Sequence, residues 1–293
     1  MSKQIKITHY YHSGFSVEFE DLLFIFDYWT GEHQDIPQNR QITSEFLRGF
    51  RQVYVLISHE HPDHLDPVVF SWKAPTPIQY IISFDMPAGI RGQRMAPGDE
   101  FSPEEGITLK TFDSTDLGVS FLLDLKGTTV FHAGDLNFWH WRNESTPNEI
   151  SEAEIDFQKA VRPLEKERID IAFFPVDPRQ GSMFEAGANY FILCVKPRLM
   201  IPMHYFHRTE IIMDYARTAG NRVTEVLAMP GIGDSIIVNL DNANYMDISF
   251  PNNNDVVAIE NEKSKEDTID QIGEDNPFSD TDLPLSQLAK YEK

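Results

Sequence analysis

The segment ISHEHPDHLD, residues 57–66, constrains the fold more than any other stretch, because it sets three histidines at the end of an apolar run. That run, VYVLI, has the length and the branched side chains of a buried strand. Side chains two positions apart on a strand point the same way, so His59 and His61 project together from its carboxyl end. Asp63 and His64 follow in the turn and can face a second point a few Å further on. The fold must therefore bring this strand end to a place where four polar side chains find a common partner.

A metal ion is the partner that this set of side chains predicts. Imidazole and carboxylate are good ligands for Zn²⁺ and similar divalent ions. A single histidine is commonly a packing or surface residue, but three histidines and an aspartate in the spacing HxHxDH are hard to place otherwise, since buried unpaired polar groups are costly.

Strand-like and helix-like segments alternate through residues 1–250 without a clear linker, which predicts one large domain. The expected strands are 5–8, 16–20, 22–26, 51–57, 78–83, 107–112, 119–124, 128–132, 169–176, 199–203, 235–240 and 245–248. The expected helices are 149–167, 188–195 and 210–219, the last stopped by Gly220, and a short one that Asp66 and Pro67 open after the histidine segment.

The composition changes at about Pro251, where an acidic tail begins. Residues 251–293 carry eleven Asp and Glu against four Lys and few aromatic residues. Such a segment buries too little apolar surface to offset its ordering entropy, so we expect it to be mostly disordered. It is either a solubilising appendage or a docking segment that uses its few leucines.

Charge and cysteine content narrow the partners and the compartment. The net charge of −21 disfavours nucleic acid, which proteins hold mainly through Lys and Arg on phosphates. No apolar stretch approaches the ~20 residues that span a membrane, and the first residues lack the apolar core of a signal peptide. Cys194 is the only cysteine, which excludes an internal disulfide and a cysteine-based zinc site and predicts a reducing cytoplasm.

The hexad HEHPDH, residues 59–64, resembles the HxHxDH signature of the metallo-β-lactamase-fold hydrolases. Further pieces fall in that family's order: FHAGD at 131–135 and IPMH at 201–204. The opening YHSGF at 11–15, with FIFD at 24–27, is similar to the branch that includes ascorbate-phosphate lactonase. The resemblance covers roughly residues 5–250. It implies an α/β protein, a four-layer αββα sandwich, with the metals at one edge between the two sheets.

The resemblance also implies the ligands of one or two divalent ions. One ion takes His59 and His61, and the other takes Asp63, His64 and His204, with Asp135 between the two. The family normally adds a histidine to the first ion from the region before the GD strand, and residues 110–118, KTFDSTDLG, contain none. Asp116, or else Asp113, could replace it as an oxygen ligand; the alternatives are water or a weak first site. We expect zinc, while an aspartate at this position would favour Mn²⁺ or Fe²⁺ more than a third histidine would.

The expected activity is hydrolysis of a small, anionic molecule whose bond is a lactone, ester, amide or phosphodiester. A metal ion supplies hydroxide at neutral pH, and Asp63 is our candidate for the general base. Arg179 is a candidate anchor for a carboxylate or phosphate, although it could equally pair with Asp177. Trp139 is a candidate wall of the substrate pocket, and His12 is expected near the metals.

Two other functions stay open. A non-catalytic scaffold or sensor could keep the fold and the metal, and the missing histidine supports it because an incomplete site need not position a nucleophile. A nuclease of the same fold would use the same ligands but would need a basic channel, which the negative net charge does not indicate. The sequence does not define an oligomeric state.

Overall fold

The computed structural model describes residues 3–31, 41–73, 75–240 and 246–251. The acidic tail expected beyond residue 250 lies, apart from Pro251, outside the described residues, so both that tail and the domain boundary stay predictions. In the described part of the chain, no helix has the length and apolar character needed to cross a membrane.

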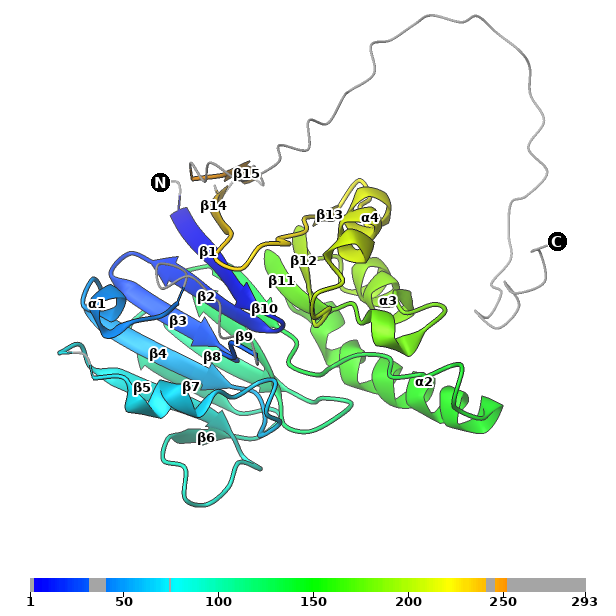
Figure 1. The fold of residues 1–293 in the computed structure, drawn as a ribbon, viewed down its shortest axis with the longest axis horizontal. Helices are drawn as coiled ribbons and strands as arrows, with labels where there is room; N and C mark the ends of the chain where they lie inside the picture. Colours follow the sequence, from blue (N-terminus) through cyan, green and yellow to red (C-terminus); the bar gives the residue numbers. More distant parts are fainter. Residues whose placement is uncertain (1–2, 32–40, 74, 241–245, 252–293) are drawn as a thin grey trace, which may run out of the picture. The chain divides into compact units, whose positions relative to one another are not determined.

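One sheet has eight strands in the order β15-β14-β1-β2-β3-β4-β5-β6 (Figure 1). Strands β3 to β6 run parallel, so their carboxyl ends meet at one edge of the sheet. The strands are β1 (Lys3–Tyr11), β2 (Gly14–Phe19), β3 (Leu22–Phe26), β4 (Gln52–Ile57), β5 (Ile78–Ser83), β6 (Gln93–Met95), β14 (Ser235–Leu240) and β15 (Met246–Ser249).

The other sheet has seven strands in the order β13-β12-β11-β10-β9-β8-β7. Here β10 to β13 run parallel. The strands are β7 (Glu100–Glu104), β8 (Ile107–Phe112), β9 (Ser120–Leu125), β10 (Thr128–His132), β11 (Ile171–Pro175), β12 (Leu199–Met203) and β13 (Glu225–Val226).

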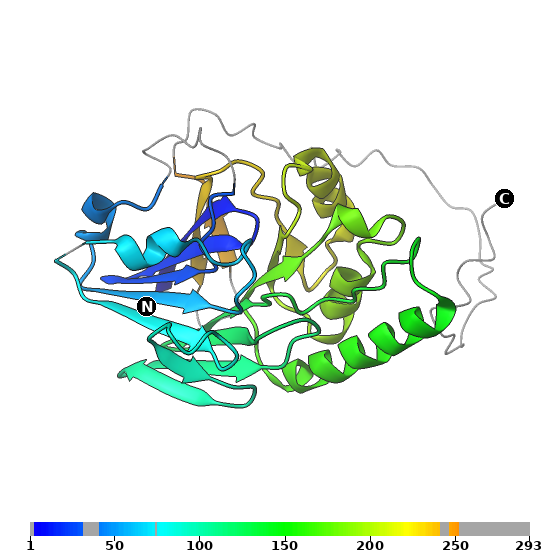
Figure 2. The same ribbon diagram turned by 60° about the horizontal axis from the view of Figure 1, so that its bottom comes forward.

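The two sheets pack face to face, and helices cover their outer faces (Figure 2). Strand β11 shows why: Phe173 points inward and stacks on Phe15 of the first sheet at 4.2 Å, while its neighbour Phe174 points outward and stacks on Phe191 at 4.4 Å. The helices beside the second sheet are α2 (Pro147–Val161), α3 (Ala186–Cys194) and α4 (Thr209–Ala219); those on the first sheet are the short α1 (Ser44–Leu47) and the 3₁₀ helix η2 (Pro67–Ser71). The predicted four-layer αββα sandwich is confirmed.

Element boundaries differ from the sequence expectation in ways that backbone chemistry explains. The helix expected over 149–167 begins two residues earlier, where Thr146 and Glu149 form a capping box. It leaves the α-conformation after Val161 and continues as a 3₁₀ turn, because Pro163 has no N–H to donate. Gly220 ends α4 as predicted, but with an ordinary φ of −63° rather than the left-handed conformation.

Five short elements of the described residues were not predicted at all: α1, β6, β7, β13 and the 3₁₀ helix η4 (Pro178–Gln180). None has a clear apolar alternation; β7, for example, is partly exposed along its length and contains Pro103.

Candidate metal centre

The histidine- and aspartate-containing segments singled out in the sequence meet at one edge of the sandwich because the strands that carry them end there. The HEHPDH segment follows β4, the Gly134–Asp135 pair follows β10, and His204 follows β12. The turn between β1 and β2 contributes His12. The carboxyl ends of neighbouring parallel strands lie on the same side of a sheet, which gathers these residues from distant parts of the chain.

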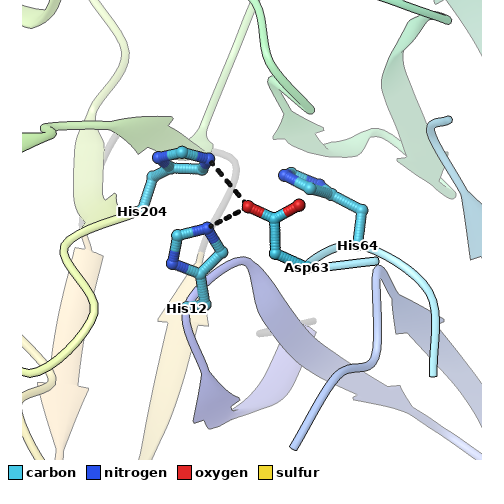
Figure 3. A group of neighbouring side chains, drawn as sticks. All are labelled: His12, Asp63, His64 and His204. Carbon is cyan, nitrogen blue, oxygen red and sulfur yellow. Dashed lines mark ion pairs between the residues drawn. The ribbon is translucent and has the colours of Figure 1, made fainter. Parts of the chain in front are cut away.

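A buried cluster is formed by His12, Asp63, His64 and His204 (Figure 3). One ligand atom from each of the four lies within 4.8 Å of all the others. Nε2 of His12 is 3.3 Å and Nε2 of His204 is 4.0 Å from the same Asp63 oxygen, Oδ2. All three imidazoles are buried, and Asp63 is the partly exposed member.

We define an outer cluster of His59, His61 and Asp116, because His61 and Asp116 form a metal-capable group with Asp135 and His59 contacts His61. Nε2 of His59 lies 3.0 Å from Nδ1 of His61, which in turn lies 3.9 Å from Oδ2 of Asp116. The side chains of His61 and Asp116 are 39% and 43% exposed, so this cluster borders solvent. Asp113 is in none of the metal-capable groups of the described residues and accepts a hydrogen bond from the amide of Ser114. Of the two aspartates considered from the sequence, only Asp116 lies in a metal-capable group of the described residues, and its role as a replacement for the expected histidine stays a prediction.

Asp135 joins the two clusters. Its Oδ1 lies 3.0 Å from Nε2 of His64 and 3.3 Å from Nε2 of His204. Its Oδ2 lies 3.4 Å from Nε2 of His59. One carboxylate thus offers one oxygen to each cluster, which is the arrangement required of a bridging ligand.

Several buried polar atoms of the centre lack a well-formed hydrogen bond, which indicates that the residues fit a divalent ion. Nε2 of His12, His64 and His204 and Oδ1 of Asp135 are buried and make no well-formed hydrogen bond, although they lie 3.0–3.3 Å from one another or from Asp63. Leaving several such atoms unpaired is costly, so a ligand for them is expected. Ligands bonded at ~2.0–2.1 Å in a tetrahedral zinc site stand about 3.3 Å apart, which matches the separations here.

The charges of the cluster also suit a cation. Burial would raise the pKa of Asp135, but the imidazoles of His64 and His204 outweigh it and hold that pKa well below its usual value. For His64 the opposite holds: burial would lower the pKa, and the carboxylates of Asp135 and Asp27 raise it well above the ordinary histidine value. The site therefore keeps its carboxylates ionised and attracts positive charge.

Two buried carboxylates, which sequence reasoning did not assign to the centre, orient its histidines. Nδ1 of His64 donates to Asp27 at 2.8 Å, and Nδ1 of His204 donates to Asp177 at 3.0 Å. Each bond leaves Nε2 as the free nitrogen, which is how carboxylates usually prepare histidine ligands for metals. Asp27 also accepts from Ser58 Oγ at 2.6 Å, and that hydroxyl lies 2.9 Å from Nδ1 of His59. The available signal was position: both aspartates follow the apolar residues of a buried strand, in FIFD and FFPVD.

Replacement of Asp27 by alanine is expected to weaken metal binding by roughly 10–100-fold, because His64 and His59 lose the group that fixes their orientation. It also leaves buried polar atoms unpaired, which costs about 1–3 kcal/mol each in the free energy of unfolding. Chelator competition and urea unfolding measure the two effects. The exposed Asp21→Asn exchange, in the same region of the chain, is the control; equal behaviour of the two variants would contradict this role of Asp27.

The role of Asp116 can be tested by counting ions. If it holds the outer ion, Asp116→Ala should reduce the metal content from two equivalents per chain to one, while Asp113→Ala keeps two. Elemental analysis of purified, dialysed protein gives the numbers. A content of one equivalent in the unaltered protein that Asp116→Ala leaves unchanged would remove Asp116 from the centre.

A pocket of about 370 Å³ opens above both clusters. Its walls include Trp139 and Trp141, whose rings are stacked with centroids 5.8 Å apart, and Trp139 is fixed by donating from Nε1 to the backbone oxygen of Asp135 at 2.8 Å. The remaining lining residues are His61, Asp63, Thr115, Asp116, Arg179 and His204. A larger open groove of about 730 Å³, between α3 and α4, shares none of these residues.

Two of the three residues expected to bind substrate line the pocket, and the third lies beneath it. Trp139 and Arg179 line the pocket. Arg179 also forms the salt bridge that was its alternative role, with Nη2 2.6 Å from Asp177 Oδ2, and its guanidinium lies 4.4 Å from the centre of the Phe206 ring. His12 is absent from the pocket lining and has no exposed surface, so it lies beneath the pocket, in the buried cluster.

Known proteins similar in sequence to this chain are named metal-dependent hydrolases. No protein-family model matches the chain. Proteins named UPF0173 metal-dependent hydrolase are similar in sequence: that of Carboxydothermus hydrogenoformans is 26% identical over 219 residues, and that of Pyrobaculum neutrophilum 22% identical over 218 residues. Each alignment covers 69% of this chain and 84% of the relative.

Among solved structures, Igni18, a metallo hydrolase from Ignicoccus hospitalis, matches with a TM-score of 0.54 and 16% identity, over 81% of this chain and 100% of that one. CmlA, a diiron β-hydroxylase from Streptomyces venezuelae, matches with a TM-score of 0.55 and 11% identity, over 81% of this chain and 54% of that one. At these identities the likeness shows a common fold, and function has to be argued from the site.

Proposed function

Because this chain has the metallo-β-lactamase fold, we propose that it is a metal-dependent hydrolase that acts on a small anionic molecule. The observation that carries the proposal is Asp135, whose two carboxylate oxygens face two separate groups of histidines beneath one pocket. The sequence relatives named metal-dependent hydrolases support the same class of reaction.

The chemistry follows from the donors. A divalent ion held by these residues lowers the pKa of a water molecule towards ~7 and polarises a carbonyl or phosphoryl oxygen. Asp63 lies in the pocket wall as a carboxylate: burial would raise its pKa, but His12 and the neighbouring imidazoles outweigh this and hold it below the usual range. Asp63 is therefore ionised and placed to accept a proton from water in the pocket.

For the metal, we propose zinc at the histidine-rich buried cluster, since imidazole and carboxylate together suit Zn²⁺. The outer cluster has two histidines, Asp116 and the shared Asp135, and this larger share of oxygen donors suits Mn²⁺ or Fe²⁺ as well. For location, the cytoplasm remains our proposal from the single cysteine.

For the substrate, the pocket supports a small molecule with a negative group. A volume of about 370 Å³ accommodates a small ligand, and Arg179 is the only Lys or Arg among the lining residues. Its planar guanidinium suits a carboxylate or phosphate. The bond can be a lactone, ester, amide or phosphodiester, and nucleic acid is disfavoured by the net charge of −21.

The proposed function predicts that chelator-treated protein is inactive and that Zn²⁺ or Mn²⁺ restores turnover of at least one ester, lactone, amide or phosphodiester in a substrate screen. Arg179→Ala should raise KM for anionic substrates by about 10-fold, as for loss of one charged hydrogen bond, and should leave neutral analogues unchanged. Uniform inactivity of protein with a full metal content would contradict the proposal and favour a scaffold or sensor. Salt-sensitive RNA binding with RNA cleavage would favour a nuclease.

A further inference from the structure

We propose that His12 is itself a metal ligand, so that the buried ion is held by three histidines, His12, His64 and His204, together with Asp63 and Asp135. This inference rests on the metal centre of the proposed function and extends it. It assigns to the turn between β1 and β2, which lies outside the HxHxDH segment, one bond to the ion.

The positions of the three rings are compatible with one shared ion. An ion bonded to Nε2 at ~2.0–2.1 Å stands about 3.2 Å from the ring centroid, so rings that share it must have centroids less than about 6.4 Å apart. The His12 centroid lies 3.9 Å from that of His204 and 5.8 Å from that of His64, and the last two are 5.5 Å apart. Figure 3 shows the His12 and His204 nitrogens directed at the same Asp63 oxygen, with His64 on the other side of that carboxylate.

The surroundings of His12 give an independent reason. The side chain has no exposed surface, and neither of its ring nitrogens makes a well-formed hydrogen bond, although Nε2 lies 3.3 Å from Asp63 Oδ2. A buried imidazole nitrogen that lacks a well-formed hydrogen bond is available to bind a metal ion.

The backbone at His12 gives a second reason. His12 has φ +52°, a left-handed conformation that is uncommon for residues other than glycine. Such strain persists where the surrounding structure imposes it, and it is concentrated at functional sites. Here the backbone oxygen of His12 accepts a hydrogen bond of 3.2 Å from the amide of His204. That bond ties a turn of the first sheet to the ligand-bearing strand end of the second.

The consequence is an unequal pair of sites. The buried cluster has a third histidine, while the outer cluster has two and borders solvent. We therefore expect the first ion to enter the buried cluster and to remain there, and the outer ion to exchange more readily.

The test uses one equivalent of Co²⁺ per chain and counts the bound imidazoles by X-ray absorption spectroscopy, with the visible spectrum as a second readout. His12→Gly is the main variant, because glycine accepts φ +52° and the change adds no backbone strain. His12→Gln is the second variant and preserves packing volume. His9→Ala is the matched control, since His9 is a buried histidine of β1, three residues before His12, and belongs to no metal-capable group of the described residues.

We expect both His12 variants to lose one imidazole from the Co²⁺ shell and His9→Ala to keep the count. The affinity for the first ion should fall by more than the roughly 10–100-fold that removal of a merely orienting residue costs. Free imidazole, diffusing into the space left by His12→Gly, should restore the visible spectrum of the unaltered protein.

An unchanged imidazole count in a folded His12→Gln protein would overturn the proposal and make His12 a positioning residue for Asp63. The two proposals fail separately. A metal-loaded protein that loses an imidazole in the His12 variants but hydrolyses nothing supports His12 as a ligand and removes the hydrolase. An active protein with an unchanged count does the reverse.

Discussion

Exchange of Asp135 for alanine is expected to empty both metal sites and to reduce turnover to the background rate. The two oxygens of Asp135 reach both clusters, at 3.0 Å from His64 and 3.4 Å from His59. Without it, the ions lose their shared negative ligand, and the Nε2 atoms of His64 and His204 lose the carboxylate oxygen that both of them contact. Metal-ion catalysis contributes several kcal/mol, so the loss in kcat/KM should be about 10³-fold or more.

Metal content by elemental analysis and turnover of the best screened substrate measure the two effects together. Asp135→Asn keeps the size and one oxygen, so it separates the loss of charge from the loss of shape, and we expect it to retain at most one ion. Asp113→Asn, in the loop beside the outer cluster, should behave as the unaltered protein. Full metal content with normal turnover in Asp135→Ala would refute both the bridging geometry and the mechanism.

Local patterns explain why much of this centre could be predicted from the sequence. The ligands His59, His61, Asp63 and His64 lie within six residues, directly after an apolar strand, so their proximity needs no knowledge of the fold. Asp135 and His204 were predicted from the resemblance of FHAGD and IPMH to the metallo-β-lactamase-fold hydrolases, and in the structure each follows a strand of the parallel set, β10 or β12. The same periodicity predicted most long strands and helices.

The parts that were missed depend on contacts between distant segments. Asp27 meets His64 across 37 positions and Asp177 meets His204 across 27, and no local pattern signals either bond. His12 was expected near the metals but was assigned to the substrate; its full burial becomes visible only when the two sheets are packed. The salt bridge between Arg179 and Asp177 joins residues only two positions apart, so it could be considered from the sequence alone.

The loop that contains Asp116 packs closely against the chain at Gly118. Gly118→Ala is therefore expected to be the most destabilising single change at the centre. Gly118 has φ +77°, and a Cβ added there would overlap the carbonyl oxygen of Ser58 and approach the Cβ of His59 to 2.7 Å. The adjacent amide of Val119 donates to that same carbonyl at 3.1 Å. An added methyl must therefore push the loop away from the strand end that carries the histidines, at a cost of about 3–5 kcal/mol in the free energy of unfolding.

Because Asp116 lies two residues before Gly118, the displaced loop should also carry Asp116 away from His61, so the variant should lose the outer ion and keep the buried one. Urea unfolding and metal content measure these effects. Gly98→Ala is the control for backbone strain alone. Gly98 has φ +91°, but a Cβ there meets nothing within 4 Å, so the free energy of unfolding should fall by only about 1 kcal/mol. If the two variants were equally stable and equally loaded, close packing of the loop on Ser58 could not be what positions Asp116. A large difference, with one ion lost only in Gly118→Ala, would show that a backbone contact behind the site determines whether the outer ion is bound.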